Sequence, residues 1–181
     1  PNYGEFYEGR WFASGAGVCQ TIDLLGEAVC LSPGQLFPCN DLPELVVGCE
    51  LCEDLWAPYP PSVSQALAGA TVIVNLSASN EVVGKDAYRR DLGKGQSGRL
   101  SCAYLYCSAG DGESTTDLVF SGHQILAEDG VILAERRDMA PGMVVTEIDV
   151  QKLIGERRRR NTFDSPGWMG ESSESAGFSL P

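Results

Sequence analysis

The sequence is poor in basic residues and has no long apolar run. It contains 13 Lys and Arg against 25 Asp and Glu, which gives a formal net charge of −12. Phosphate backbones and anionic lipid surfaces repel such a chain, so we expect no nucleic-acid or membrane partner. Its apolar runs fall well short of the roughly 20 residues that a membrane-spanning helix needs. With 43% apolar and 21% charged residues, the composition is typical of a soluble globular protein.

Histidine is nearly missing as well, since His123 is the only one. This argues against a cysteine–histidine dyad, so any general base must be a carboxylate or a lysine. A zinc site would need a second ligand pair besides Cys49-x-x-Cys52, and the sequence offers none. The same pair could form a redox dithiol, but the acidic Glu53 and Asp54 disfavour a thiolate there. We expect no metal or cofactor in this chain and a structural, hydrogen-bonding role for His123.

The cysteine count is odd, which does not suit a secreted disulfide scaffold. Several of the cysteines lie inside apolar, strand-like runs, where a free thiol behaves as a small hydrophobic side chain. We therefore expect a reducing, cytoplasmic setting. The seven cysteines are Cys19, Cys30, Cys39, Cys49, Cys52, Cys102 and Cys107.

Two apolar runs rich in β-branched residues stand out in the first half of the chain. Leu45–Cys52 and Thr71–Leu76 are continuous apolar stretches, as expected for strands buried on both faces. Between them, prolines break the chain, and a short helical stretch begins at Ser62 and ends at Gly69. Two buried strands joined by a short helix form a βαβ unit, so we expect them to be parallel.

The remaining segments indicate an α/β layered fold with later antiparallel strands. A charged, helix-like stretch follows Gly84, although its glycines weaken it. Glu128-Asp129-Gly130 predicts a hairpin turn. Residues 1–42 are predicted to be loops laid over the body. Further strands are predicted at Ala103–Cys107, Leu118–Phe120, Gln124–Leu126, Val131–Leu133 and Met143–Ile148, and a surface helix at Val150–Arg160. Its Arg157–Arg160 run favours a solvated helix end or a subunit contact.

Cys52 is the strongest candidate for chemistry. It directly follows an apolar run, and Glu53, Asp54 and Trp56 come after it. Sites in α/β proteins form at the carboxyl ends of strands, where a thiol can face a pocket. A nucleophilic cysteine would need a nearby cation or aligned backbone N–H groups to favour its thiolate. On spacing alone, a buried strand cysteine before a solvated acidic turn is an equal alternative.

Several blocks, in a fixed order along the chain, together resemble a known family. They are Gly48–Trp56, Asn75–Lys85, Ser108–Gly122 and Glu156–Phe163. They resemble the glutaminase domain of glutamine-dependent NAD synthetases, which belongs to the carbon–nitrogen hydrolase (nitrilase) superfamily. The opening residues 1–8 are similar to the stretch that follows the catalytic lysine of that family. The resemblance spans residues 1–8 and 36–163, is weaker over 13–35 and is lost beyond 164.

The resemblance implies a partial α-β-β-α layered sandwich with mixed parallel and antiparallel sheets. It also implies a Glu-Lys-Cys apparatus in which a cysteine attacks the amide carbon, a glutamate is the general base and a lysine stabilises the oxyanion. Cys52 matches the nucleophile, and Glu8 matches a second glutamate that follows the lysine. The positions that match the lining of the glutamine pocket are Tyr3, Phe6, Glu53, Ser79 and Lys85.

The same resemblance places the catalytic lysine shortly before Pro1 and the base glutamate further upstream. We therefore expect residues 1–163 to be a partial glutaminase domain and 164–181 a linker toward an ATP- and Mg-dependent synthetase domain. Taken alone, the chain is expected to be an inactive fragment of an enzyme that feeds ammonia into NAD biosynthesis. Expected partners are L-glutamine, that synthetase domain and further copies of the chain. Another amidase or nitrilase of the superfamily, or a non-catalytic association module, remains an alternative.

Overall fold

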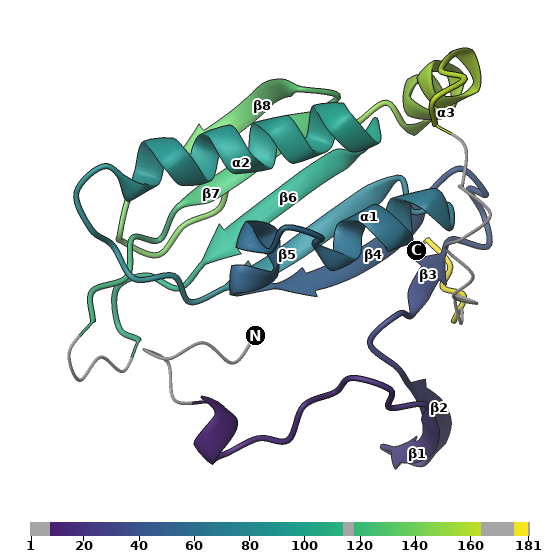
Figure 1. Cartoon of the computed structure of the whole chain (residues 1–181), viewed down its shortest axis with the longest axis horizontal. Coiled ribbons are helices and arrows are strands. Elements are labelled where there is room, and N and C mark those ends of the chain that lie inside the picture. The colour runs from purple at the N-terminus through teal and green to yellow at the C-terminus, as the bar shows by residue number, and fades with distance from the viewer. Residues whose placement is uncertain (1–7, 114–117, 164–175, 181) are drawn as a thin grey trace.

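The centre of the molecule is a six-stranded mixed sheet in the order β3-β4-β5-β6-β7-β8 (Figure 1). The computed structural model describes residues 8–113, 118–163 and 176–180. The strands are β3 (Leu36–Pro38), β4 (Val46–Leu51), β5 (Val72–Ser77), β6 (Ala103–Ser108), β7 (Gln124–Glu128) and β8 (Val131–Arg136). The strands β4, β5 and β6 run parallel, and the remaining neighbours in this sheet pair antiparallel. The predicted α/β class with a mixed sheet is confirmed.

The predicted βαβ unit is present. The apolar runs form β4 and β5, which pair in parallel, and α1 (Pro61–Leu67) connects them after the prolines. Pro61 begins α1, where its fixed φ and missing N–H carry no penalty. Because the two strands are parallel neighbours, their carboxyl ends reach the same edge of the sheet.

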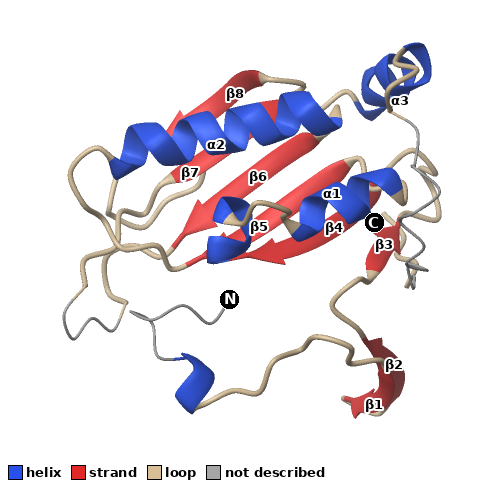
Figure 2. Cartoon of the chain, viewed as in Figure 1, coloured by secondary structure: helices blue, strands red, loops and turns tan. Residues whose placement is uncertain are grey.

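Both main helices cover one face of the sheet (Figure 2). Helix α2 (Lys85–Leu100) forms over its full length despite its glycines. The residues that it buries lie at helical spacing and are largely polar, so its sequence does not show the usual amphipathic pattern. They are Arg89, Gly93, Gln96, Ser97 and Leu100. Beneath the helices, the core includes Ile73, Tyr104, Tyr106 and Ile125.

A glycine in α2 allows close contact with the β7–β8 hairpin. A Cβ atom on Gly98 would lie 3.0 Å from the Cα of Gly130. Gly130 and Asp129 form the two-residue turn of the hairpin, and both have positive φ, as in a type I′ turn. The hairpin turn predicted at this position is therefore confirmed.

Three predictions about the remaining segments are wrong. Residues 143–148 form no strand, and Leu118–Phe120 contributes only a single bridge between Phe120 and Asn80. Ile148 instead packs against the core cluster on the sheet face away from α1 and α2, which buries an apolar side chain without strand pairing. Within the region expected to be loops, β1 (Gln20–Leu24) and β2 (Glu27–Leu31) form a separate hairpin.

Helix α3 (Val150–Arg159) confirms the predicted terminal helix, but its arginines are not all solvated. The guanidinium of Arg157 is buried and donates to main-chain oxygens at the ends of α1 and α2. Its Nε lies 3.0 Å from the oxygen of Ser101, and its Nη2 lies 2.6 Å from that of Ala70. Helix C-termini carry unpaired carbonyls and partial negative charge, which a cation stabilises. Arg157 therefore joins both helices at the edge opposite the carboxyl ends of β4–β6.

The sheet face away from α1 and α2 has solvent-exposed apolar side chains at the carboxyl ends of its parallel strands. Leu51, Leu76 and Cys107 pair across β4, β5 and β6 and are all exposed. The described residues thus supply one sheet and one helix layer of the expected sandwich.

Residues 176–180 run beside β3, where the N–H of Phe178 donates to the carbonyl of Pro38 over 3.0 Å. No helix in the described part of the chain is both long and apolar enough to cross a bilayer.

Candidate functional site

Cys52 occupies the turn between β4 and the 3-10 helix η2 (Cys52–Trp56). Its φ is 46°, in the left-handed region that non-glycine residues rarely adopt. The N–H of Leu51 donates to Asp54 Oδ2 over 2.8 Å, which closes the turn on its other side. Cys52 is partly buried, so its thiol is neither sealed in the core nor fully solvated. Such a turn at a strand end presents a nucleophile at the edge of a sheet.

Two of the other cysteines, Cys49 and Cys102, are poorer candidates for the nucleophile. Burial raises the pKa of the Cys49 thiol. Burial also raises the pKa of Cys102 to about 12, although the nearby charge of Arg157 opposes the shift. Cys39, Cys49, Cys52, Cys102 and Cys107 are free thiols, and the described residues contain no group of three or more His, Cys, Asp and Glu that could hold a metal ion. Burial therefore disfavours a thiolate at Cys49 and Cys102.

Polar residues gather at the edge of the sheet where Cys52 lies. Leu51 pairs with Leu76 in the parallel strands β4 and β5, so the residues that follow the two strands begin side by side at this edge. Asn75 Nδ2 donates to the carbonyl oxygen of Cys52 over 3.3 Å, and Ser77 donates to Asn75 Oδ1 over 2.7 Å. The N–H of Ser79 donates to Ser108 Oγ over 3.4 Å.

Three of the expected pocket residues fall in this region. Glu53 is the second residue of η2, and among the described residues no hydrogen-bond partner reaches its buried Oε2. Ser79 is buried just after β5. Lys85 begins α2, where its Nζ donates to Asn80 Oδ1 and lies 5.9 Å from the centre of the Trp56 ring. Because Trp56 belongs to η2, Lys85 lies next to the turn that carries Cys52.

The remaining site predictions cannot be placed. Tyr3 and Phe6 lie outside the described residues. Glu8 begins the short 3-10 helix η1 (Glu8–Arg10), whose backbone is described, but the Glu8 side chain lies outside what the structure describes. The expected proximity of Glu8 and Cys52 stays a prediction.

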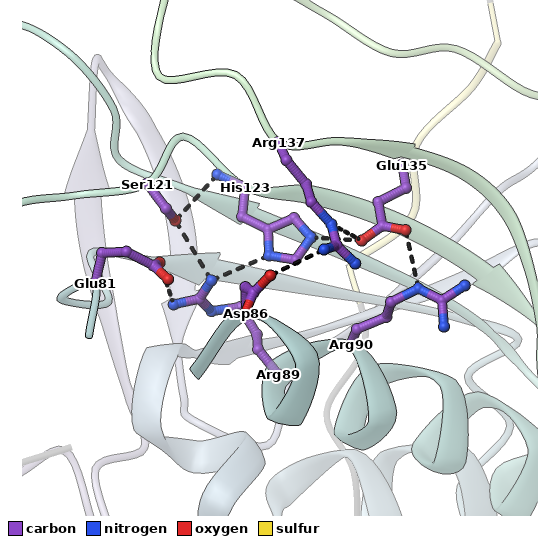
Figure 3. A network of polar contacts seen from close by, with 8 residues as sticks. All are labelled: Glu81, Asp86, Arg89, Arg90, Ser121, His123, Glu135 and Arg137. Atoms are coloured by element: carbon purple, nitrogen blue, oxygen red, sulfur yellow. Dashed lines mark hydrogen bonds and ion pairs between the residues drawn. The ribbon is translucent and has the colours of Figure 1, made fainter. Parts of the chain in front are cut away.

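Arg89 links Glu81, in the loop after β5, to Ser121 and His123, in the segment before β7 (Figure 3). Its side chain is fully buried on α2, and its Nη2 lies 3.1 Å from Glu81 Oε2 and 3.5 Å from Ser79 Oγ. Its Nη1 lies 3.0 Å from His123 Nδ1 and 3.4 Å from Ser121 Oγ. The guanidinium of Arg89 therefore contacts both the loop after β5 and the segment before β7.

His123 is held as a neutral imidazole in this network. A guanidinium only donates, so His123 Nδ1 accepts from Arg89 and its proton resides on Nε2, which lies 2.9 Å from Glu135 Oε1. Burial lowers the pKa of His123, although the hydrogen bond to Glu135 opposes the shift. Burial alone would raise the pKa of Glu135, but hydrogen bonds led by that from Arg137 lower it to about 2. The role expected for His123 is the one it has in the structure.

An open cavity of about 570 Å³ lies at the same carboxyl edge. Its lining includes Ser77, Ser108, Asp111, Glu113 and Gln124. Asp111 and Glu113 are exposed on the turn after β6. Cys52 is not among the lining residues, so this cavity borders the candidate site rather than containing its thiol.

Sequence reasoning missed two residues that organise this edge. Asn75 was detectable, because a carboxamide inside an otherwise apolar strand must find partners when it is buried. Arg89 was not, because the adjacent Arg90 has the same chemistry and only the helical phase places Arg89 against the sheet.

Comparison with known proteins identifies relatives that match most of the chain. No protein-family model matches the chain. The glutamine-dependent NAD(+) synthetase of Mycobacterium tuberculosis (strain ATCC 25618 / H37Rv) is 44% identical over 166 residues, which cover 91% of this chain and 24% of that protein. The chain thus spans about a quarter of the length of the curated relatives it matches.

Solved structures agree with this relationship. A glutamine-dependent NAD(+) synthetase from Cytophaga hutchinsonii superposes with a TM-score of 0.59 at 26% identity, covering 75% of this chain and 21% of that one. Nit3 of Saccharomyces cerevisiae, a member of the nitrilase superfamily, superposes with a TM-score of 0.55 at 21% identity. That match covers 64% of this chain and 42% of Nit3, and it bears on the fold alone.

Proposed function

We propose that this chain, a relative of the glutamine-dependent NAD(+) synthetases with the nitrilase-superfamily fold, supplies the nucleophile and part of the substrate pocket of a glutaminase. The sequence relationship over 91% of the chain carries this proposal. The position of Cys52 supports it, because the residue sits in a left-handed turn at the carboxyl edge of parallel strands.

In the proposed reaction, the Cys52 thiolate attacks the side-chain amide carbon of L-glutamine. The S–C bond forms and the C–N bond breaks, and the amide nitrogen leaves as ammonia after it receives a proton. Water then hydrolyses the glutamyl thioester to glutamate and regenerates the thiol. Covalent catalysis of this kind divides one difficult amide hydrolysis into two easier steps.

The pocket must bind the α-amino acid head group of glutamine. In our proposal the unpartnered carboxylate oxygen of Glu53 accepts from the α-ammonium group, and Ser79 and Lys85 donate to the α-carboxylate. Tyr3 and Phe6 would line the aliphatic stem, and Glu8 would assist at the thiol. A site built on buried hydrogen bonds discriminates against analogues that lack the bonding groups much more strongly than an apolar pocket does.

Further parts of the machinery are proposed from the family resemblance alone. A lysine and a base glutamate outside residues 1–181 would complete the catalytic apparatus. A synthetase domain, using ATP and Mg, would consume the ammonia in the conversion of deamido-NAD to NAD. Association with further copies of the chain and a cytoplasmic location belong to the same proposal.

A chimera tests the proposal, with residues 1–163 replacing the corresponding segment of the M. tuberculosis synthetase. We expect it to release ammonia from glutamine and to turn over propionamide poorly. Ser79→Ala and Lys85→Ala should each raise KM for glutamine by about 10- to 100-fold, since each removes a hydrogen bond to a charged group. Lys94→Ala is the matched control, because Lys94 is exposed on the same helix. Efficient propionamide hydrolysis with glutamine ignored would indicate an ordinary amidase instead.

A further inference from the structure

The backbone of Cys52 is in a conformation that is unusual for a non-glycine residue. The other non-glycine residues with positive φ among those described are Leu25, Ser101 and Asp129. Leu25 and Asp129 occupy hairpin turns and Ser101 ends α2, positions where the left-handed conformation is common. Cys52 joins a strand directly to a 3-10 helix, a position where the surroundings must hold a left-handed residue. The hydrogen bond from Leu51 to Asp54 holds the turn from within, and contacts from other elements can add to it.

Asn75 makes such a contact. Its side chain is buried on β5, and its Nδ2 group donates to the carbonyl oxygen of Cys52 over 3.3 Å and to the hydroxyl of Tyr104 over 3.1 Å. Its Oδ1 accepts from Ser77 over 2.7 Å. A carbonyl oxygen only accepts, which fixes the orientation of the amide, and both amide protons are then used.

The partners of Asn75 are themselves anchored in the core. Since Tyr104 accepts from Asn75, its own proton is directed to the carboxylate of Glu50, its second partner. The other oxygen of Glu50 accepts from the N–H of Ser62 at the start of α1 over 2.9 Å. Tyr104 and Glu50 are both buried. A continuous set of hydrogen bonds therefore runs from the first turn of α1 to the carbonyl of Cys52.

We propose that Asn75 is a positioning residue that holds the Cys52 turn in its left-handed conformation and so presents the thiol to substrate. The proposal rests on the proposed function in that Cys52 is the nucleophile. Asn75 acts on the main chain of Cys52 rather than on the reacting atoms. Without this hydrogen bond, the turn relaxes and the thiol loses its defined position at the edge of the sheet.

The test is the rate at which iodoacetamide alkylates Cys52 in the native 181-residue chain and its variants. Peptide mapping by mass spectrometry separates Cys52 from the other cysteines. We expect Asn75→Ala and the near-isosteric Asn75→Leu to slow alkylation of Cys52 about tenfold, because the thiol is no longer presented by the sharp turn. Ser77→Ala, which leaves the amide in place but frees its oxygen, should slow it about two- to threefold.

Thr71→Val is the matched control for lost stability. Thr71 is buried just before β5, and its hydroxyl donates to the carbonyl of Glu44, far from the Cys52 turn. This variant should leave the alkylation rate of Cys52 unchanged. Equal rates in the Asn75 variants and Thr71→Val would overturn the proposal. If the Asn75 variants do not fold, an unchanged rate in Ser77→Ala would do the same.

A second measurement separates this proposal from the glutaminase assignment. In the chimera with the M. tuberculosis synthetase, Asn75→Ala should lower kcat for glutamine about 100-fold, as expected for a misplaced reacting group, with KM almost unchanged. If the chimera ignores glutamine, the glutaminase assignment fails, while the alkylation rates still report on Asn75. If the chimera hydrolyses glutamine and Asn75→Ala behaves like Thr71→Val, only the positioning role fails.

Discussion

Buried polar side chains near the candidate site have specific hydrogen-bond partners, and the partners of His123 require its neutral form. Its Nδ1 accepts from Arg89 and its Nε2 donates to Glu135, so the neutral imidazole satisfies both neighbours. Protonation would place a proton on Nδ1 facing the guanidinium of Arg89, with that of Arg137 also nearby. The ring is therefore a structural element whose geometry requires the neutral form.

This geometry predicts a loss of stability in mild acid. The pKa of His123 is lower in the folded chain than in the unfolded one. As the pH falls, the folded state therefore binds fewer protons than the unfolded state. The free energy of unfolding should be highest above about pH 6.5 and should decrease as the pH drops below it. Glu135, whose pKa is lowered to about 2, should add a second decrease below about pH 4.5.

Urea unfolding between pH 8 and pH 5 measures the first decrease. His123→Gln keeps hydrogen-bonding capacity but cannot titrate, so its unfolding midpoint should depend less on pH over this range. The variant will be less stable than the native chain at pH 8, where the native imidazole makes both hydrogen bonds. Parallel pH profiles for the two proteins would show that another group causes the loss.

The residue-level assignments made from sequence differ in quality for a physical reason. The position of Cys52 at the end of a strand was detectable, because an apolar run followed by a thiol and two acids is a local pattern. The buried role of Arg157 was not, because four consecutive arginines look equivalent and only the docking of α3 buries one of them. Long-range contacts decide such cases, and they leave no local signature.

At the scale of elements, β-branched apolar runs predicted β4 and β5 and their parallel pairing correctly, and β6 was predicted as a strand without its orientation. The same reasoning failed at residues 143–148, where Ile148 packs against the sheet but Met143 and Val145 are exposed. Helix α2 was the opposite case, since its glycines suggested weakness although the helix is complete. Tertiary packing overrides helix propensity there, because a small residue lets the helix approach the β7–β8 hairpin.

Two glycines of α2 provide an internal comparison. Gly98→Ala should destabilise the chain by about 1–2 kcal/mol, because its Cβ would meet the backbone of Gly130 at 3.0 Å. Gly95→Ala should stabilise it by about 0.5–1 kcal/mol, because alanine favours the helix and nothing lies within 4 Å of the added Cβ. Urea midpoints give both values. A stabilised Gly98→Ala variant would mean that the hairpin moves away from α2 at little cost.

At the scale of the whole molecule, one sheet covered by two helices on a single face brings the ends of β4 and β5 together. Cys52 and the residues that follow β5 then lie at one edge without any further loop insertion. The opposite edge is fixed by Arg157, which joins the ends of α1 and α2. The chain thus separates the positions that hold the layers together from those that present the candidate chemistry. The resemblance to glutamine-dependent NAD synthetases, first drawn from blocks of sequence, is confirmed by relatives 44% identical over 91% of the chain.

The last prediction concerns the activity of the 181-residue chain itself. We expect no measurable release of ammonia from glutamine, because residues 1–181 do not include the catalytic lysine and the base glutamate that the family resemblance implies. Catalytic residues that act as a unit depend on one another, so the loss of a single one lowers kcat roughly 10⁴- to 10⁶-fold. The chimera with the M. tuberculosis synthetase should recover ammonia release, and Cys52→Ala in it should abolish that release, whereas Cys107→Ala should retain it. Cys107 is the matched control because it is an exposed thiol at the carboxyl edge of the same sheet. Strong glutamine hydrolysis by the 181-residue chain would mean that its own residues supply the base and the oxyanion donor, and the proposed mechanism would have to be replaced.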